Sequence, residues 1–128
     1  MARLACLAVL ALALAACGGD DAGDARQAVR DFVEATNARD GDQLCGELLT
    51  QEYLEKATGA TGDNAEDACK QQLDIITGLK LRLVKIDGVT VDGDRATVRA
   101  TIATGGQRMA RRFGLAKQDG DWKLDSGS

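Results

Sequence analysis

The chain has 128 residues, no histidine and a formal net charge of −4. This length is sufficient for one small domain and too short for two. The excess of acids argues against binding to nucleic acid and against broad binding to anionic lipid, so we expect neither.

The first residues have the pattern of an export signal. Arg3 precedes an apolar run of Leu, Ala and Val over residues 4–16. This run is too short to span a bilayer core, which takes roughly 20 residues. It ends in Leu-Ala-Ala-Cys at residues 14–17, which resembles the lipobox of bacterial lipoprotein precursors. An ordinary cleaved signal, with Cys17 there by chance, is the alternative.

The lipobox resemblance implies a signal peptide over residues 1–16 and lipidation of Cys17, with acyl chains such as palmitate. Two or more chains, at about 0.8 kcal/mol per buried methylene, make membrane attachment stable. We therefore expect a lipid-anchored protein at the cell membrane, on its extracytoplasmic face. Residues 17–23 are rich in Gly and Asp and predict a flexible lipidated tether, which leaves 24–128 as the folded domain.

Three helices are predicted in the first part of the domain. Asp24 and Gln27 resemble a capping box ahead of apolar residues at helical spacing, which predicts a first helix from Asp24. A shorter helix follows Asp42, and Thr50 caps a further turn or two. Asn64 is expected to cap the third helix.

Four cysteines are present. The lipobox resemblance implies that Cys6 leaves with the signal and that Cys17 carries lipid. Cys45 and Cys69 remain, on the apolar stripes of different predicted helices. Outside the cytoplasm such a pair predicts a disulfide, which would stabilise the fold by about 3 kcal/mol. A zinc site is disfavoured because the chain has no histidine and no second cysteine at short spacing.

The second part of the domain has the period-two pattern of β-strands. Asp92-Gly93, Gly105-Gly106 and Asp119-Gly120 are signals for two-residue hairpin turns. We expect four antiparallel strands, at residues 80–91, 95–104, 107–118 and 121–126. A change of phase in the first strand predicts a bulge around Asp87 and Gly88.

The hairpin at Gly105-Gly106 fixes the register of the two middle strands, because opposed residue numbers must sum to 211. We expect the helices to cover the face formed by these residues: Val89, Val91, Ala96, Val98, Ala100, Ile102, Met109, Arg111, Phe113, Leu115, Trp122 and Leu124.

Arg111 is the one charged residue on this predicted inner face, opposite Ala100. A buried charge needs a partner or water. Arg111 could face a ligand in a cleft and hold a carboxylate or phosphate. Alternatively it reaches the rim or pairs with a helix carboxylate of Glu34, Glu47 or Glu52. The candidate ligand-facing residues are Arg111, Phe113, Trp122, Met109 and Tyr53.

Several of these features together resemble the NTF2-like (SnoaL-like) superfamily, most closely its small lipoproteins from high-GC, actinobacterial-type bacteria. The resemblance rests on Ala28, Val29, Phe32, Val33, Asn37, Asp40, Gly41, Asp42, Leu48 and the run from Val89 to Trp122. It implies an α+β cone, in which three N-terminal helices pack on a curved four-stranded antiparallel sheet around an apolar cavity.

The residues favour an envelope lipoprotein without enzymatic activity, metal or cofactor. Such a protein would bind a small apolar or amphipathic ligand or an envelope protein partner. The alternative is an NTF2-like hydrolase or isomerase that uses Arg111 and a helix carboxylate in the cavity. No metal-binding, phosphate-binding or nucleophile motif is present, and fold resemblance alone carries no activity.

Overall fold

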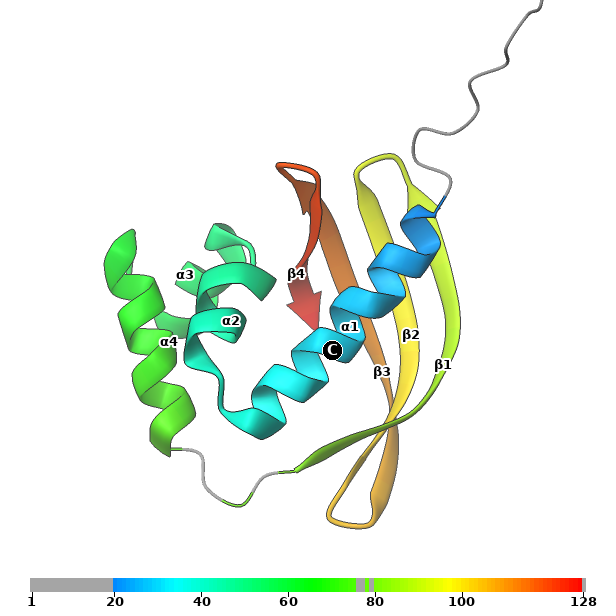
Figure 1. Ribbon diagram of the computed structural model, residues 1–128, viewed down its shortest axis with the longest axis horizontal. Coiled ribbons are helices and arrows are strands. Elements are labelled where there is room, and N and C mark those ends of the chain that lie inside the picture. The colour runs from blue at the N-terminus through cyan, green and yellow to red at the C-terminus, as the bar shows by residue number, and fades with distance from the viewer. Residues whose placement is uncertain (1–19, 76–77, 79, 128) are drawn as a thin grey trace, which may run out of the picture.

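A long helix lies across one face of a curved antiparallel sheet, with the remaining helices grouped beside it (Figure 1). The computed structural model describes residues 20–75, 78 and 80–127. The predictions for the signal peptide, Cys6 and the lipidation of Cys17 therefore lie outside the described residues. No helix within the described ranges combines the length and apolar character that crossing a bilayer requires.

Helix α1 (Asp21–Ala38) begins three residues before the predicted start at Asp24. Two acids, Asp21 and Asp24, lie in its first turn, where the helix dipole favours negative charge. The predicted capping box is wrong, because the Gln27 amide donates to Asp31 one turn further on (2.8 Å). The helix therefore takes in residues 21–23, which we expected to belong to the tether.

The segment between α1 and the third predicted helix is divided more finely than expected. It contains α2 (Gly41–Gln43), the π-helical turn η1 (Leu44–Leu48) and α3 (Gln51–Thr58). The Asp40 side chain caps α2, and Thr50 caps α3 as predicted. Helix α4 (Asp63–Ile75) starts at Asp63, so Asn64 lies inside its first turn. The prediction that Asn64 caps this helix is therefore wrong.

The four strands agree closely with the expected ranges and pair in sequence order. They are β1 (Leu81–Asp92), β2 (Arg95–Thr104), β3 (Gln107–Gln118) and β4 (Asp121–Gly127). The predicted bulge is present between Ile86 and Gly88, and a second irregularity lies between Leu83 and Lys85. The predicted register of β2 and β3, in which opposed residue numbers sum to 211, is confirmed along the whole pair, including Ala100 opposite Arg111.

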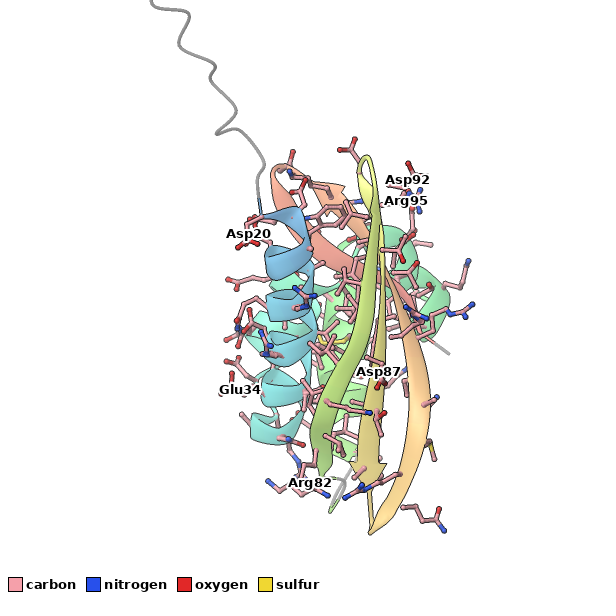
Figure 2. All side chains as sticks on the ribbon, turned by 90° about the vertical axis from the view of Figure 1, so that its right-hand side faces the viewer. Asp20, Glu34, Arg82, Asp87, Asp92 and Arg95 are labelled. Carbon is pink, nitrogen blue, oxygen red and sulfur yellow. A yellow bond between two sulfur atoms is a disulfide. The ribbon has the colours of Figure 1, made fainter. Side chains whose placement is uncertain are left out.

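The apolar residues form two clusters. One lies between α1 and the inner face of the sheet, and it contains the largest fully buried strand side chains, Val98, Leu115 and Leu124. The other lies among the helices around Cys45 and Leu54. Figure 2 shows α1 and the sheet as two layers with side chains filling the space between them. This arrangement is the expected α+β cone.

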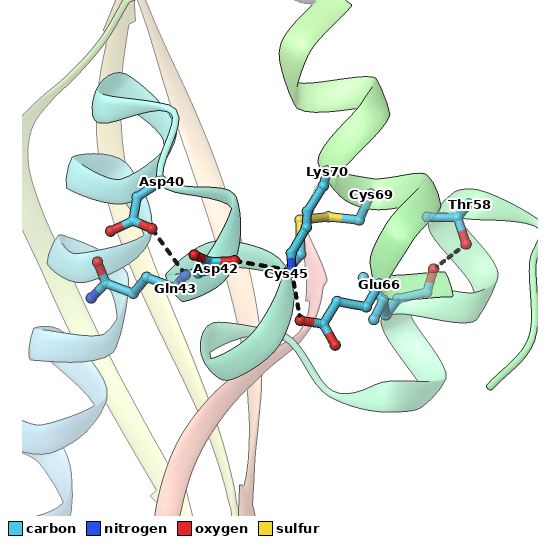
Figure 3. The surroundings of a disulfide bond; sticks show 9 residues. Asp40, Asp42, Gln43, Cys45, Thr58, Glu66, Cys69 and Lys70 are labelled. Atoms are coloured by element: carbon cyan, nitrogen blue, oxygen red, sulfur yellow. Dashed lines mark hydrogen bonds and ion pairs between the residues drawn. A yellow bond between two sulfur atoms is a disulfide. The ribbon is translucent and has the colours of Figure 1, made fainter. Parts of the chain in front are cut away.

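The predicted disulfide between Cys45 and Cys69 is present, with a Cα–Cα distance of 5.9 Å (Figure 3). It joins η1 to α4. Beside it, Lys70 lies 3.0 Å from Asp42 and 3.2 Å from Glu66. The hydrogen bond with Asp42, followed by that with Glu66, raises the pKa of Lys70. The bridge therefore ties α4 to η1, which itself contacts α1 and β4.

The helices leave part of the inner face uncovered. Val91 and Met109 both lie on that face and are exposed. Our expectation that the helices cover the whole face is therefore wrong at these positions. Strand alternation determines which face of the sheet a side chain lies on. Whether that side chain is buried depends on whether a helix packs over it.

Candidate functional site

A pocket of about 210 Å³ opens between the end of α1, α3 and the inner face of the sheet. We name it the Arg111 pocket. Most of its wall is apolar, and its polar groups are the Tyr53 and Thr104 hydroxyls and the Arg111 guanidinium. Its lining residues are Phe32, Val33, Tyr53, Leu81, Ile102, Thr104, Arg111, Phe113 and Gly127.

Two contacts hold the walls of this pocket. The rings of Phe32 on α1 and Phe113 on β3 lie 5.9 Å apart in a tilted arrangement. Asn37, near the end of α1, donates from Nδ2 to the Leu81 carbonyl (2.7 Å), and its Oδ1 accepts from the Leu81 N–H (2.8 Å). This pair of bonds fixes the start of β1 against α1 and so fixes one edge of the pocket.

Arg111 lies on the inner face as predicted, but its side chain is exposed. It stands at the open end of the inner face and reaches the rim, which was one of the alternatives. Within the described residues it makes no ion pair with a carboxylate. Glu34 points away from the sheet on the outer side of α1 (Figure 2), and Glu47 and Glu52 are exposed on other elements.

Trp122 belongs to a different part of the surface. It lies under an open hollow of about 590 Å³ between α1, η1 and the β3–β4 turn, which we name the Trp122 hollow. The indole is only 6% exposed and donates to Asp21 (3.4 Å), while the ammonium of Lys117 lies 5.8 Å from its ring centroid. Trp122 is thus mainly a core residue that closes the floor of the hollow.

The five candidate residues are therefore not brought to one place. Tyr53, Phe113 and Arg111 line the Arg111 pocket, and Trp122 lies under the separate hollow. Met109 is 40% exposed and lines neither. Whether any of the five contacts a ligand stays a prediction.

Charge is distributed unevenly between the two parts of the chain. Residues 20–75 contain 14 acidic and 5 basic side chains, whereas residues 80–127 contain 10 basic and 6 acidic ones. The net charges are −9 and +4, so the acidic character of the whole chain conceals a basic sheet. Most residues that line the Arg111 pocket belong to the basic segment 80–127. This positive charge favours an anionic ligand.

The lining of the Arg111 pocket suits binding better than proton transfer. Among its described lining residues there is no carboxylate that could act as a base beside Arg111. In the described part of the chain there is also no group of three or more acidic or cysteine side chains arranged to hold a metal. The helix carboxylate that the hydrolase or isomerase alternative requires is therefore not among the lining residues of this pocket.

Sequence reasoning missed the polar contacts that connect distant elements. Besides Asn37 with Leu81, the fully buried Thr50 donates from Oγ1 to Asp125 (2.8 Å), and Arg95 lies 2.9 Å from the same carboxylate. Thr50 gave a local signal because of its position as a helix cap. Its partner on β4 is 75 residues away and left no local pattern.

Neither the family models nor the curated proteins include a match to this chain. Solved structures do resemble it. The intermembrane-space region of the chloroplast protein ARC6 aligns at 22% identity and a TM-score of 0.56, covering 84% of this chain and 95% of that one. An NTF2-like protein of unknown function from Silicibacter pomeroyi aligns at 19% identity and a TM-score of 0.55, covering 83% and 91%.

A protein described as a scytalone dehydratase from Novosphingobium aromaticivorans aligns at 19% identity and a TM-score of 0.54, covering 83% of this chain and 80% of that one. Identities this low speak to the fold and to nothing further. Together with the order of the elements, they show that this chain has the α+β cone of NTF2-like proteins.

Proposed function

We propose that this protein is a lipoprotein anchored through Cys17 to the extracytoplasmic face of the cell membrane. We further propose that its NTF2-like domain binds a small amphipathic anion in the Arg111 pocket, without catalysing a reaction. The observation that carries the second part is the combination of apolar walls with an exposed arginine that has no carboxylate partner among the described residues.

The size of the pocket limits the ligand. About 210 Å³ is below the roughly 300–1,000 Å³ of pockets that enclose drug-sized molecules. The ligand is therefore a short molecule or one end of a longer one. The phenyl rings accommodate its apolar part, and the guanidinium of Arg111 binds its carboxylate or phosphate with a charge-assisted hydrogen bond.

The position of the start of α1 limits how an anchored domain could be oriented relative to the membrane. Cys17 precedes Asp21 by four residues, which span at most about 14 Å even when fully extended. The β1–β2 and β3–β4 turns lie at the same end of the molecule as the start of α1 (Figure 1). In this proposal that end faces the membrane, and the Arg111 pocket lies away from it.

The binding proposal is tested with hexanoate as the probe, which pairs a short apolar chain with a carboxylate. Isothermal titration should show saturable binding to the full chain, weakened about tenfold or more in Arg111→Met, because a hydrogen bond to a charged group is lost. Hexanol, which lacks the charge, should bind both proteins equally. Equal affinity of hexanoate for both proteins would rule out the pocket as proposed.

The anchor is tested separately by replacing Cys17 with Ala. The variant should take up no labelled palmitate and should leave the membrane fraction, because the lipid attachment site is lost. A Cys6→Ala variant is the matched control and should be labelled and anchored like the wild type. A Cys17→Ala protein of mature size that stayed in the membrane fraction would refute the anchor.

A further inference from the structure

Among the described residues, the first half of β3 pairs with a neighbouring strand on one side only. Residues 107–112 pair with β2, but pairing with β4 begins at Phe113 opposite Gly127. All six residues of this segment are exposed. Figure 1 shows the β2–β3 hairpin extending beyond the end of β4. We name residues 107–112 the open edge.

The register shows which backbone groups the open edge offers. In a two-residue hairpin the residues flanking the loop form a hydrogen-bonded pair, and such pairs recur at every second residue. Thr104 and Gln107 flank this loop. The odd-numbered residues of the open edge therefore bond to β2. The N–H and C=O groups of Arg108 and Ala110 point to the free side, where no described strand pairs with them.

The side chains of the open edge determine which partner it accepts. It carries three arginines, Arg108, Arg111 and Arg112, and no acid. Pairing with the same edge of a second copy would bring these charges together, and like charges across strands are unfavourable. A strand with carboxylates would instead neutralise them. The same arginines thus oppose self-association and favour an acidic partner.

The Arg111 pocket lies beside this edge, because Arg111, Phe113 and Gly127 all contribute to its lining. A strand added in line with β4 would continue the sheet past Gly127. Its inward side chains would alternate above the pocket, whose volume suits one side chain and not a whole drug-sized ligand.

From these observations we infer that an extended acidic segment of a partner protein adds a strand to the open edge and places one side chain in the Arg111 pocket. This inference rests on the proposed function, since it uses the same pocket. Backbone hydrogen bonds supply affinity in this type of recognition, and the pocket and the arginines supply specificity. The open edge lies away from the start of α1, so a tether near Asp21 leaves it accessible to such a partner.

The test uses the full chain and a synthetic peptide of about seven residues with alternating Val and Glu, a length typical of a strand. Ala110→Pro removes an outward N–H while sparing the bonds to β2, since proline is tolerated where the N–H faces solvent. It should weaken peptide binding about tenfold. Ala110→Val keeps the N–H and should bind as the wild type does. A peptide with Lys in place of Glu should bind at least tenfold more weakly.

Circular dichroism checks that Ala110→Pro is folded. If it is not, the double variant Arg108→Gln with Arg112→Gln replaces it, with Arg26→Gln on α1 as the matched control; only the double variant should weaken binding. Unchanged peptide binding by Ala110→Pro or by the double arginine variant would overturn the inference. Equal binding of the Glu and Lys peptides to the wild type would also overturn it. Binding of hexanoate without binding of the peptide would overturn it and leave the proposed function standing, whereas failure of both probes would remove both.

Discussion

The two halves of β3 have the same alternation of inward and outward side chains, but they differ in how far those side chains are buried. In residues 113–118, Phe113 and Leu115 are buried in the cluster between α1 and the sheet and Ala116 is also buried, whereas all of residues 107–112 are exposed. Both halves hydrogen-bond to β2 along one continuous register. The difference therefore comes from the neighbours: among the described residues, pairing with β4 ends at Phe113, and the helices leave the first half uncovered.

The strongest way to sharpen this comparison is to truncate one inner-face residue in each half. Leu115 is 1% exposed, and Leu115→Ala should lower the free energy of unfolding by about 2–5 kcal/mol because it leaves a cavity. Met109→Ala should change it by about 0.5 kcal/mol or less, as exposed sites usually do. Urea titration measures both. Equal losses would mean that the first half is covered in solution.

Removing the disulfide tests how independent the helical cluster is of the open edge. Replacing Cys45 and Cys69 together with Ala should lower the free energy of unfolding by about 3 kcal/mol, because the bridge closes a loop with a sequence separation of 24. Peptide binding at the open edge should persist under conditions where the variant is folded. Full stability of the double variant in a chemical unfolding curve would contradict the structural role of the bridge.

Asn37 connects the two layers at the edge of the Arg111 pocket. Asn37→Ala removes both bonds to the backbone of Leu81 and should lower the free energy of unfolding by about 2 kcal/mol. It should also weaken hexanoate binding, since Leu81 lines the pocket. Gln27→Ala, which removes an exposed bond within α1, is the control and should cost far less. A loss no larger than that of the control would show that the two bonds contribute little.

The smallest expected effect concerns Asp87 on β1. The Thr101 hydroxyl donates to its carboxylate (2.9 Å) and, with Lys85, lowers the pKa below its ordinary value of 3.8. A lowered pKa in the folded state adds stability that is present above the unfolded pKa and is lost as the pH falls through the folded one. Thr101→Val should therefore raise the pKa of Asp87 and reduce the stability lost on acidification below about pH 4. Carboxyl NMR titration of both proteins measures this, and an unmoved pKa would contradict it.

Much of the sheet could be predicted from sequence because its signals are local. The turn dipeptides delimit β2 and β3 at the expected residues, and Gly105-Gly106 fixes the pairing of Ala100 with Arg111. The disulfide followed from the number of available cysteines and their apolar stripes. Each of these inferences uses residues close in sequence or a small set of alternatives.

The candidate site was less predictable because its properties depend on distant elements. Alternation places Arg111 on the inner face, but its exposure depends on where β4 and the helices end. Trp122 and Phe113 share that face and still belong to separate hollows. The bond of Asn37 with Leu81 spans 44 residues, and no local pattern indicates it.

The open edge is the central claim, and amide hydrogen exchange of the free protein tests it most directly. The amides of Arg108 and Ala110 should exchange fast, and those of Met109 and Arg111 should be protected by their bonds to β2. Slow exchange at all four positions would show that another strand already covers the edge, and would contradict this account.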